Sequence, residues 1–464
     1  MSKVATRFAP SPTGALHIGG VRTALFNYVY AKQKEGLFLV RIEDTDRERS
    51  KKEYEQNILA NLKSIGINPD EKPINQSERN AIYVKAAERI FESGNAYWCD
   101  CSPETLEAMR NEQSAAGKKP MYDGRSRNLG LKRSDNTVLR LATPENGEIV
   151  VSDLIRGEIK FQNNELDDLI LLRSDGTPTY HLCNVVDDYE QKVTTVIRGE
   201  DHISNTPRQI HIQNALGYPK LEYAHLPLVL GTDKKRLSKR HAATSLDEYH
   251  SMGYLNESII NTLARLGWSG GENEVFTLDE LIRDFNISEV QKAGAIFDIT
   301  KLDWINSQHL NNLSKEAFKT QIMPFIDNLG IDYSEYQQLD ELIEAMRSVK
   351  PNLQLIAQAL IPYLDTFKEY DEKGVNKFLI GSEETLKLVI ESLKTINNWS
   401  EKEIDSMLVK IQEQLGLKTP QMNQPIRIAL TGSTQSPSLG LTIKLMGREK
   451  SIELLNKALE FITK

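Results

Sequence analysis

The sequence is poor in cysteine and lacks long apolar runs. Three cysteines among 464 residues are too few for a disulfide framework and are typical of a reducing compartment. No stretch is apolar for long enough to predict a membrane span, and the first residues carry no apolar signal core. These absences favour a cytoplasmic protein and make a membrane partner unexpected.

Net positive charge is also missing. A formal charge of −8 excludes a surface that is basic throughout, so a nucleic-acid partner would have to be held by local patches. Two short segments could supply such patches, although an ordinary solvated face is the alternative for each. The first contains Lys118, Lys119, Arg125, Arg127, Lys132 and Arg133, and the second contains Lys234, Lys235, Arg236, Lys239 and Arg240.

The sequence is long enough to form several domains. A length of 464 residues exceeds what one hydrophobic core supports and predicts roughly three or four domains. Apolar residues make up 39% and charged residues 26% of the chain, which indicates a folded globular protein rather than a disordered one.

The most informative N-terminal feature is His17-Ile18-Gly19-Gly20. This motif follows a β-type run from Lys3 to Phe8 and opens a helix-patterned stretch from Val21 to Lys34. The first amides of a helix lack intrahelical partners and the helix dipole favours negative charge, so we predict a seat for a nucleotide phosphate here. The two glycines leave the backbone open to close approach.

Hydrophobic periodicity predicts the fold class. Residues 1–80 and 178–240 alternate between strand and helix patterns, whereas 81–177 carries short strands and turns. Beyond 245 the pattern is almost wholly helical. We therefore expect an α/β protein in which a Rossmann-like nucleotide-binding domain is interrupted by an α+β insertion and followed by an all-helical C-terminal region.

Four long motifs occur in order along the first half of the chain. They are Arg7-Phe8-Ala9-Pro10-Ser11-Pro12-Thr13-Gly14 leading into His17-Ile18-Gly19-Gly20, then Val40-Arg41-Ile42-Glu43-Asp44-Thr45-Asp46, Tyr180-His181-Leu182-Cys183-Asn184-Val185-Val186-Asp187-Asp188, and Leu237-Ser238-Lys239-Arg240. Together with a later Ile428-Ala429-Leu430-Thr431-Gly432 stretch, they resemble bacterial glutamyl-tRNA synthetases, which are class I aminoacyl-tRNA synthetases. The resemblance covers essentially the whole chain.

The resemblance implies a monomeric glutamate–tRNA ligase that uses ATP with Mg²⁺, L-glutamate and tRNA(Glu). It also gives each part a role. The expected parts are the two halves of the catalytic domain (1–80 and 178–240), an inserted acceptor-stem-binding domain (81–177), a stem-contact domain with the end of the lysine loop (241–320) and a helical anticodon-binding domain (321–464).

Two related activities remain as alternatives. A glutaminyl-tRNA synthetase is close in chemistry, and a non-discriminating enzyme would also charge tRNA(Gln) with glutamate. The Ala-Pro-Ser-Pro-Thr-Gly sequence and the helical, rather than β-barrel-like, tail favour glutamate. A short paralogue that modifies a tRNA base would lack this tail, and an inactive relative would be expected to lose His17 or Lys239.

By the same resemblance, the ATP site would contain His17, Gly19, Gly20, Leu237, Ser238 and Lys239. His17 and Lys239 would be the catalytic residues. Both reaction steps accumulate negative charge in the transition state, so hydrogen-bond donors and cations are needed there rather than a covalent nucleophile. For a histidine or a basic loop taken alone, a packing or solvated role is the alternative.

Glutamate recognition requires one group that pairs with carboxylates and another that holds the ammonium. Arginine suits the first task and a carboxylate suits the second. The residues that match the family's glutamate site are Arg7, Ala9 (through its backbone), Ser11, Glu43, Tyr180, Asn184 and Arg198.

A zinc site and an anticodon contact are the remaining hypotheses. Cys99-Asp100-Cys101 begins like a zinc motif that some family members carry, but the matching segment 122–127 contains no cysteine or histidine. Since structural zinc needs four sulfur or nitrogen donors, we expect no metal site. The residues that match the family's anticodon contacts are Arg427, Pro437 and Leu439.

Overall fold

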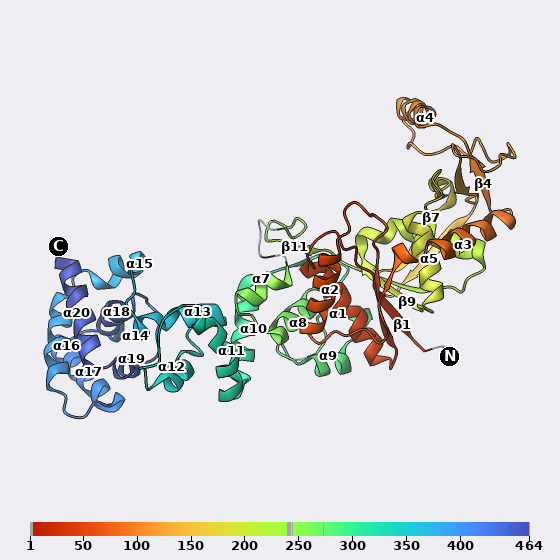
Figure 1. The fold of residues 1–464 in the computed structure, drawn as a ribbon. Coiled ribbons are helices and arrows are strands. Elements are labelled where there is room, and N and C mark those ends of the chain that lie inside the picture. The colour runs from red at the N-terminus through yellow and green to blue at the C-terminus, as the bar shows by residue number, and fades with distance from the viewer. Residues whose placement is uncertain (1–2, 239–242, 244, 272, 464) are drawn as a thin grey trace. The chain divides into compact units, whose positions relative to one another are not determined.

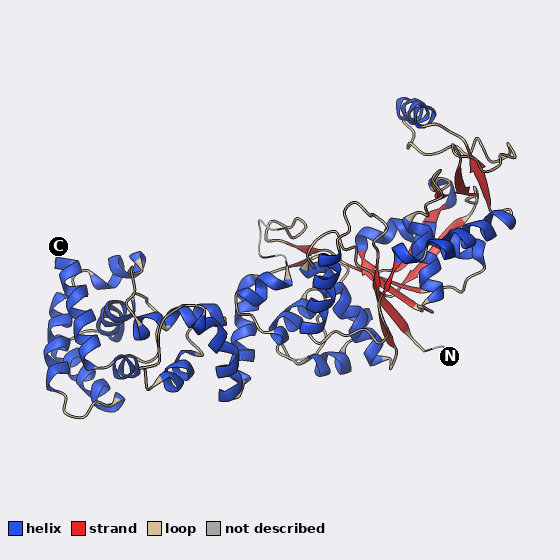
Figure 2. Ribbon diagram, in the orientation of Figure 1, coloured by secondary structure: helices blue, strands red, loops and turns tan. Residues whose placement is uncertain are grey.

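The computed structural model describes residues 3–238, 243, 245–271 and 273–463. They form two compact units, the first comprising Met1–Glu248 and Ile259–Ile299 and the second Tyr249–Ser258 and Thr300–Lys464. All strands of the described chain belong to the first unit (Figures 1 and 2). No helix within the described ranges has the length and apolar character that a bilayer span requires.

A parallel sheet forms the centre of the first unit. It consists of two sets of paired strands that lie side by side. The first set is β3 (Ile74–Asn75), β2 (Leu37–Ile42) and β1 (Ala5–Phe8), and the second, next to β1, begins with β9 (Thr195–Gly199) and β10 (Glu222–Leu226). At the junction of β1 and β9, the Thr194 amide donates to the Ala5 carbonyl over 2.9 Å. β1, β2 and β9 are almost entirely buried, as expected for strands with both faces covered.

Helix α1 (Ile18–Gln33) follows β1 and packs on the sheet. Val21, Leu25 and Val29 recur at helical spacing and are fully buried, so one stripe of the helix faces the core. The helix begins three residues earlier than its apolar pattern predicts, because the side chain of His17 caps it.

The first unit contains further helices that connect its strands. They are α2 (Lys52–Ser64), α3 (Asn80–Glu92), α4 (Pro103–Ala115), α5 (Tyr180–Glu190), α6 (Thr206–Leu216) and α9 (Leu278–Asp284), with 3-10 turns η1 (Gln76–Glu78), η2 (Asn163–Glu165), η3 (Glu200–Asn205) and η4 (Ile287–Glu289). The chain passes between the two units within α7 (Leu246–Ser251) and α8 (Asn256–Arg265).

The segment 81–177 contributes to two different sheets. β4 (Ala96–Cys99), β5 (Val138–Leu141) and β8 (Ile170–Leu172) form a separate antiparallel sheet. The hairpin of β6 (Glu148–Asp153) and β7 (Gly157–Gln162) instead extends the central sheet, because β6 pairs in parallel with β10 at Asp153 and Tyr223. Periodicity alone does not reveal this pairing.

Two short strands follow the central sheet. β11 (Val229–Leu230) pairs in parallel with β12 (Ala295–Ile296). β11 also faces the segment that leads into the lysine loop, since the Leu237 amide donates to the Val229 carbonyl at 2.9 Å.

The second unit consists of helices and connecting loops, with no strand among its described residues. Its elements are α10 (Ile299–Asn312), α11 (Lys315–Asp327), α12 (Leu339–Met346), α13 (Leu353–Ala359), α14 (Ile361–Leu364), α15 (Glu372–Gly374), the π-helix η5 (Val375–Leu379), α16 (Glu383–Thr395), α17 (Glu401–Leu415), α18 (Thr419–Thr431), α19 (Leu439–Met446) and α20 (Arg448–Thr463).

Local sequence explains where these helices begin and end. α17 starts after Ser400, whose side chain accepts the Glu403 amide, and stops at Gly416, whose φ of 65° suits glycine. α16 buries Leu386, Val389 and related apolar residues at helical spacing in one core. The predicted α/β fold class with a helical C-terminal region is confirmed.

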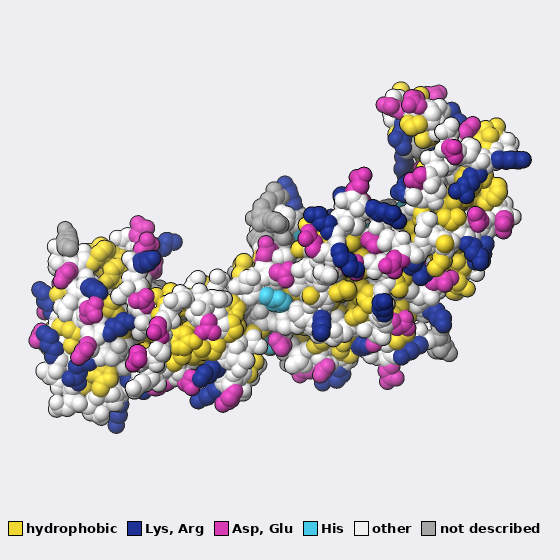
Figure 3. Space-filling model, viewed as in Figure 1, with side chains coloured by type: hydrophobic (Ala, Val, Ile, Leu, Met, Phe, Trp, Pro, Cys, Tyr) yellow, Lys and Arg dark blue, Asp and Glu magenta, His cyan; other side chains and the backbone are white. Residues whose placement is uncertain are grey.

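The surface carries charged side chains of both signs. On the face drawn in Figure 3, lysine and arginine side chains alternate with aspartate and glutamate side chains in both units. This face is therefore not basic throughout.

Candidate active site

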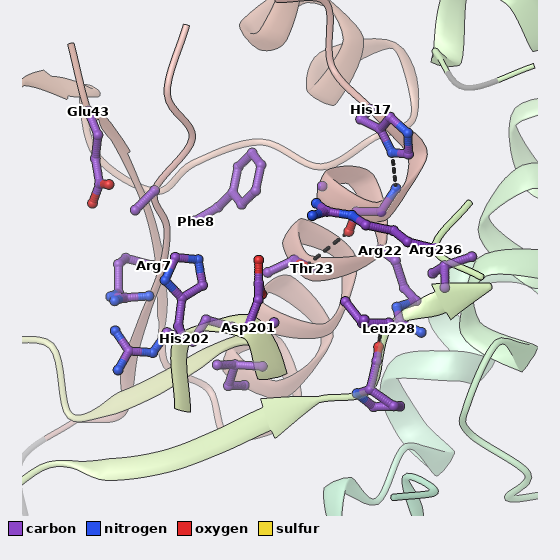
Figure 4. A pocket seen from close by; sticks show the side chains of 18 of the residues that line it. Arg7, Phe8, His17, Arg22, Thr23, Glu43, Asp201, His202, Leu228 and Arg236 are labelled. Atoms are coloured by element: carbon purple, nitrogen blue, oxygen red, sulfur yellow. Dashed lines mark hydrogen bonds between the residues drawn. The ribbon is translucent and has the colours of Figure 1, made fainter. Parts of the chain in front are cut away.

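A cavity of about 260 Å³ opens at the carboxyl ends of β1, β2 and β9, beside the N-terminus of α1. Open α/β sheets bind ligands at this edge. In Figure 4, Arg7 and Glu43 lie on one side of the cavity, and His17, Arg22 and Arg236 lie on the other. The predicted site residues that line it are Arg7, Ala9, His17, Gly19, Gly20, Glu43, Tyr180, Asn184, Arg198 and Leu237.

Two predicted residues of the described chain are not among those that line the cavity, and a third is not described. Ser11 has an exposed side chain, and Ser238 is half-buried at the end of the described segment before the lysine loop. Lys239 lies outside the described residues.

His17 caps α1 and presents a donor to the cavity. Its Nδ1 accepts the Gly19 amide at 3.2 Å, so the neutral ring carries its proton on Nε2. Partial desolvation and the nearby charge of Arg236 lower the pKa of His17, which favours this neutral form. One N–H group is therefore available where the helix N-terminus already favours an anion.

An ion-pair network holds the opposite side of the cavity. Arg7 Nε and Arg41 Nη1 both bind Asp188 Oδ1, at 3.0 Å and 2.7 Å. Arg41 Nη2 also lies 3.5 Å from Glu43 Oε1. Burial alone would raise the pKa of Asp188, but the two guanidiniums hold it below its usual range. The network thus keeps Asp188 ionised and anchors Arg7.

The same network extends to Asp187 and is neutral as a whole. Asp187 Oδ1 accepts from Arg79 Nε at 2.8 Å, and its Oδ2 accepts from the Tyr83 hydroxyl at 2.8 Å. The carboxylates Glu43, Asp187 and Asp188 therefore balance the guanidiniums Arg7, Arg41 and Arg79.

Glu43 faces the cavity from the end of β2. Asn184 Nδ2 donates to Glu43 Oε1 at 2.6 Å and fixes its orientation. Burial raises the pKa of Glu43, although Arg41 and Arg7 oppose this effect. A desolvated carboxylate in this position gains from an incoming cation.

Arg198 differs from Arg7 and Arg41 because the side chains that accept its hydrogen bonds are neutral. Its Nε donates to His225 Nε2 at 3.2 Å, its Nη1 to Gln209 Oε1 at 2.8 Å and its Nη2 to Thr206 Oγ1 at 2.9 Å. Arg198 is 6% exposed, and no ion pair to it occurs within the described ranges. Desolvation lowers its pKa, so an anionic ligand would relieve the cost of its burial.

Beside the predicted Tyr180, the cavity contains Asp201 and His202, which the sequence reasoning missed. Tyr180 has its pKa raised to about 12 by burial, so its hydroxyl stays protonated, and it lies 3.4 Å from His202 Nδ1. Burial lowers the pKa of His202 to about 4. Both His202 and the neighbouring Asp201 come directly after β9. Their place at a strand's carboxyl end was the signal that could have identified them.

A second missed group holds the chain between β10 and the lysine loop. Arg22 on α1 donates to the carbonyls of Pro227 and Leu266, and the Leu228 amide donates to Glu200 Oε1 at 2.9 Å. These contacts position one wall of the cavity. Arg22 was missed because it lies within the helical pattern of α1, where a polar residue is ordinarily expected on the solvent face.

The two cysteines of the zinc hypothesis lie against hydroxyl groups. Cys99 Sγ donates to Tyr122 Oη at 3.4 Å, and Cys101 Sγ lies 3.7 Å from Ser126 Oγ. Across the described ranges, no group of three or more His, Cys, Asp or Glu side chains is placed to hold a metal ion.

The anticodon candidates lie in the second unit. Arg427 on α18 donates through Nε to Ser436 Oγ at 2.8 Å and is half-buried. Pro437 is buried, and Leu439 is 4% exposed within the hydrophobic core. Among these three candidates, Arg427 is thus the one whose side chain is partly accessible.

Comparisons with known proteins agree over the full length. A family model of class I tRNA synthetases for E and Q (glutamate and glutamine), catalytic domain, matches residues 3–304, and an anticodon binding domain model matches 316–459. A glutamate–tRNA ligase of Thermodesulfovibrio yellowstonii is 43% identical over 462 residues, which cover 98% of this chain and 99% of that protein.

Two solved structures are similar in fold as well. A glutamate tRNA ligase of Elizabethkingia meningosepticum, in complex with its amino acid, is 32% identical with a TM-score of 0.85. A glutamate-tRNA synthetase of Elizabethkingia anophelis is 31% identical with a TM-score of 0.83, and each comparison covers 99% of this chain and 100% of the other. The chain therefore belongs to the class I tRNA synthetases for glutamate and glutamine, among the glutamate–tRNA ligases.

Proposed function

We propose that this chain joins L-glutamate to tRNA(Glu), using ATP to form glutamyl-adenylate and then transferring the glutamyl group to the 3′-terminal adenosine. The names of the relatives support this activity. The chemistry of the cavity supports the choice of amino acid.

The charge of Arg198 is the observation that carries the proposal. Glutamate brings two carboxylates and one ammonium, and its net negative charge matches the guanidinium of Arg198, whose hydrogen-bond partners are neutral side chains. Glutamine is neutral overall and would leave that buried cation uncompensated, at a cost of several kcal/mol. Arg7 and Arg198 would hold the carboxylates, while Glu43 would accept the ammonium.

The remaining glutamate contacts are hydrogen bonds. Tyr180 stays protonated and can donate, and Asn184 orients Glu43 while lying beside Arg7. The Ala9 backbone lines the same side of the cavity. Ser11 is proposed on the resemblance alone, because its side chain is exposed and is not among those that line the cavity.

In the activation step, a carboxylate oxygen of glutamate attacks the α-phosphorus of ATP, and pyrophosphate leaves. His17 Nε2–H would donate to the phosphate as its charge grows, beside the open backbone of Gly19 and Gly20. Leu237 and Ser238 would border the nucleotide, and Lys239 would follow the departing pyrophosphate. Mg²⁺ would enter with the phosphates of ATP, as part of that substrate.

In the transfer step, a ribose hydroxyl of the terminal adenosine attacks the glutamyl carbonyl, and AMP leaves. A monomer would carry out both steps. We propose that 81–177 and 241–320 contact the acceptor stem and that 321–464 reads the anticodon.

The direct test is aminoacylation with radiolabelled glutamate and glutamine on purified tRNA(Glu) and tRNA(Gln). We expect glutamate to be attached to tRNA(Glu) and glutamine to neither tRNA. Attachment of glutamine, or absence of any charging by the folded enzyme, would contradict the proposal. Charging of tRNA(Gln) with glutamate would identify a non-discriminating enzyme.

Arg427 is proposed to contact an anticodon base. We expect Arg427→Ala to lower kcat/KM for wild-type tRNA(Glu) by an amount equivalent to about 1–3 kcal/mol and to have a smaller effect on a transcript with a mutated anticodon. The reason is that a base contact specifies sequence, whereas a phosphate contact only positions. The measurement is kcat/KM for both transcripts with each enzyme.

The matched comparison is Lys118→Ala combined with Lys119→Ala, since both side chains are exposed in the insertion. This double variant should weaken charging of both transcripts equally and flatten the salt dependence, because its contacts would be to phosphates. An equal penalty for Arg427→Ala on the two transcripts would show that Arg427 does not read the anticodon.

A further inference from the structure

Arg198 is held by a buried chain of hydrogen bonds that the local sequence does not reveal. His225 on β10 lies between Arg198 on β9 and Asp153 at the end of β6. The Nδ1 atom of His225 is 2.6 Å from Asp153 Oδ2, and its Nε2 atom is 3.2 Å from Arg198 Nε. The side chains of His225 and Asp153 are both 0% exposed.

Hydrogen-bond chemistry determines the protonation of this histidine. A guanidinium nitrogen can only donate, so His225 Nε2 must offer a lone pair to Arg198. An ionised carboxylate can only accept, so Nδ1 must carry the proton and donate it to Asp153. His225 is therefore neutral, in the Nδ1–H form. Desolvation, which lowers the pKa of His225, acts in the same direction.

Asp153 is fixed by the backbone around it. Its Oδ1 accepts the amides of Ile155 and Arg156, each at 2.9 Å, and its Oδ2 accepts the amide of His225 at 3.1 Å. These bonds, together with that from His225 Nδ1, hold the pKa of Asp153 below its ordinary value despite its burial. The carboxylate thus stays ionised and sets the orientation of the imidazole.

The hydrogen bonds around Arg198 determine which of its donors are left for a substrate. Three of the five N–H donors of the Arg198 guanidinium are used by His225, Gln209 and Thr206, which leaves two for a ligand in the cavity. A planar guanidinium binds a carboxylate well only when its edge has the correct orientation. No carboxylate bonds directly to the Arg198 guanidinium, because its three partners are uncharged and Asp153 lies on the far side of His225.

We propose that Asp153 and His225 are positioning residues for glutamate: Asp153 selects the Nδ1–H form of His225, and His225 fixes Arg198 without neutralising it, so that the cation is left for a substrate carboxylate. This inference rests on the proposed function of Arg198. It assigns a role in amino-acid recognition to the β6–β7 hairpin, which the chain inserts between the two halves of the catalytic domain.

The first test is Asp153→Asn, which keeps the shape of the side chain. If the amide oxygen retains the bonds from Ile155 and Arg156, the amide nitrogen faces His225 Nδ1. This donor favours the other tautomer of His225, which carries its proton on Nε2. Its Nε2–H would then point at the Nε–H of Arg198, and the hydrogen bond between them would be lost. We expect KM for glutamate to rise by about 10-fold or more. KM for ATP, and kcat at saturating glutamate, should change far less.

The second test is His225→Phe, which keeps a ring but removes the acceptor for Arg198. Its matched control is His211→Phe, because His211 on α6 is also buried and bonds to Asn163 Oδ1 at 3.1 Å, away from Arg198. KM for glutamate should rise in the first variant and stay near the wild-type value in the second. Thermal melting of each variant identifies one that fails to fold, and Asp153→Asn then provides the decisive measurement.

A double-mutant cycle separates positioning from general damage. In an Arg198→Met background, Asp153→Asn should add little to KM for glutamate, because the residue that it positions is gone. A full additional increase would overturn the proposal, as would an unchanged KM in folded Asp153→Asn and His225→Phe. If Arg198→Met itself leaves KM for glutamate unchanged, the proposed glutamate site fails instead.

Discussion

Replacement of His17 by asparagine is expected to lower turnover by about 10²- to 10³-fold while leaving α1 capped. Asparagine Oδ1 can accept the Gly19 amide as His17 Nδ1 does, and asparagine is a preferred N-cap residue. The substitution therefore removes only the Nε2–H donor, and loss of one such donor to a charged transition state has about this effect. Single-turnover aminoacylation of tRNA(Glu) measures the chemical step.

Two further variants complete the test of His17. His17→Ala should lose the same turnover and also about 1 kcal/mol of helix stability, because its cap is removed. His17→Gln, whose amide nitrogen can occupy the place of Nε2, should retain part of the activity. If His17→Asn turns over at the wild-type rate, His17 acts only as a helix cap and the phosphate donor must be another group.

Arg198→Met is expected to raise KM for glutamate by about 30-fold or more. Truncating one partner of a buried, hydrogen-bonded charge pair costs about 2–5 kcal/mol, and each 1.4 kcal/mol is about a factor of ten in affinity. KM for ATP should change little, since Arg198 interacts electrostatically with Arg7 and Tyr180, which belong to the proposed glutamate side of the cavity. Initial rates at varied glutamate and varied ATP give both constants.

Selectivity should fall together with affinity. The preference for glutamate over glutamine is assigned to the uncompensated charge of Arg198, so the ratio of kcat/KM for the two amino acids should drop by a similar factor in Arg198→Met. Arg89→Met is a suitable control, because Arg89 is exposed on α3 and donates to the Leu216 carbonyl instead of lining the cavity. An unchanged ratio in Arg198→Met would show that another group rejects glutamine.

Local signals in the sequence were sufficient for much of the fold and for the nucleotide side of the cavity. The apolar stripe of α1 and the buried runs of β1 and β2 depend on residues close together in the chain. The same holds for a phosphate seat at a helix N-terminus, where His17, Gly19 and Gly20 are neighbours. Motifs of this kind can be read because the physics that gives them meaning is local.

The balance of charge in the cavity could not be read in this way. The charges of Arg7 and Arg41 are balanced by Asp188, which is 181 residues beyond Arg7. Arg198 has no carboxylate bonded to it, because the fold surrounds it with neutral acceptors. The sequence shows only that arginines and aspartates are present. Burial and partner choice decide which cation is left for the substrate.

The position of the β6–β7 hairpin was likewise decided by tertiary structure. Strand patterns within 81–177 predicted short strands but not that β6 would pair with β10, and Asp153 lies 72 residues from His225 in the chain. Sequence alone therefore determined the family, the helix–strand order and the phosphate-binding corner, which rest on local propensity and contiguous motifs. The tertiary structure decided which side chains hold Arg198, because a buried hydrogen bond between distant strands exists only once long-range packing has excluded water from it.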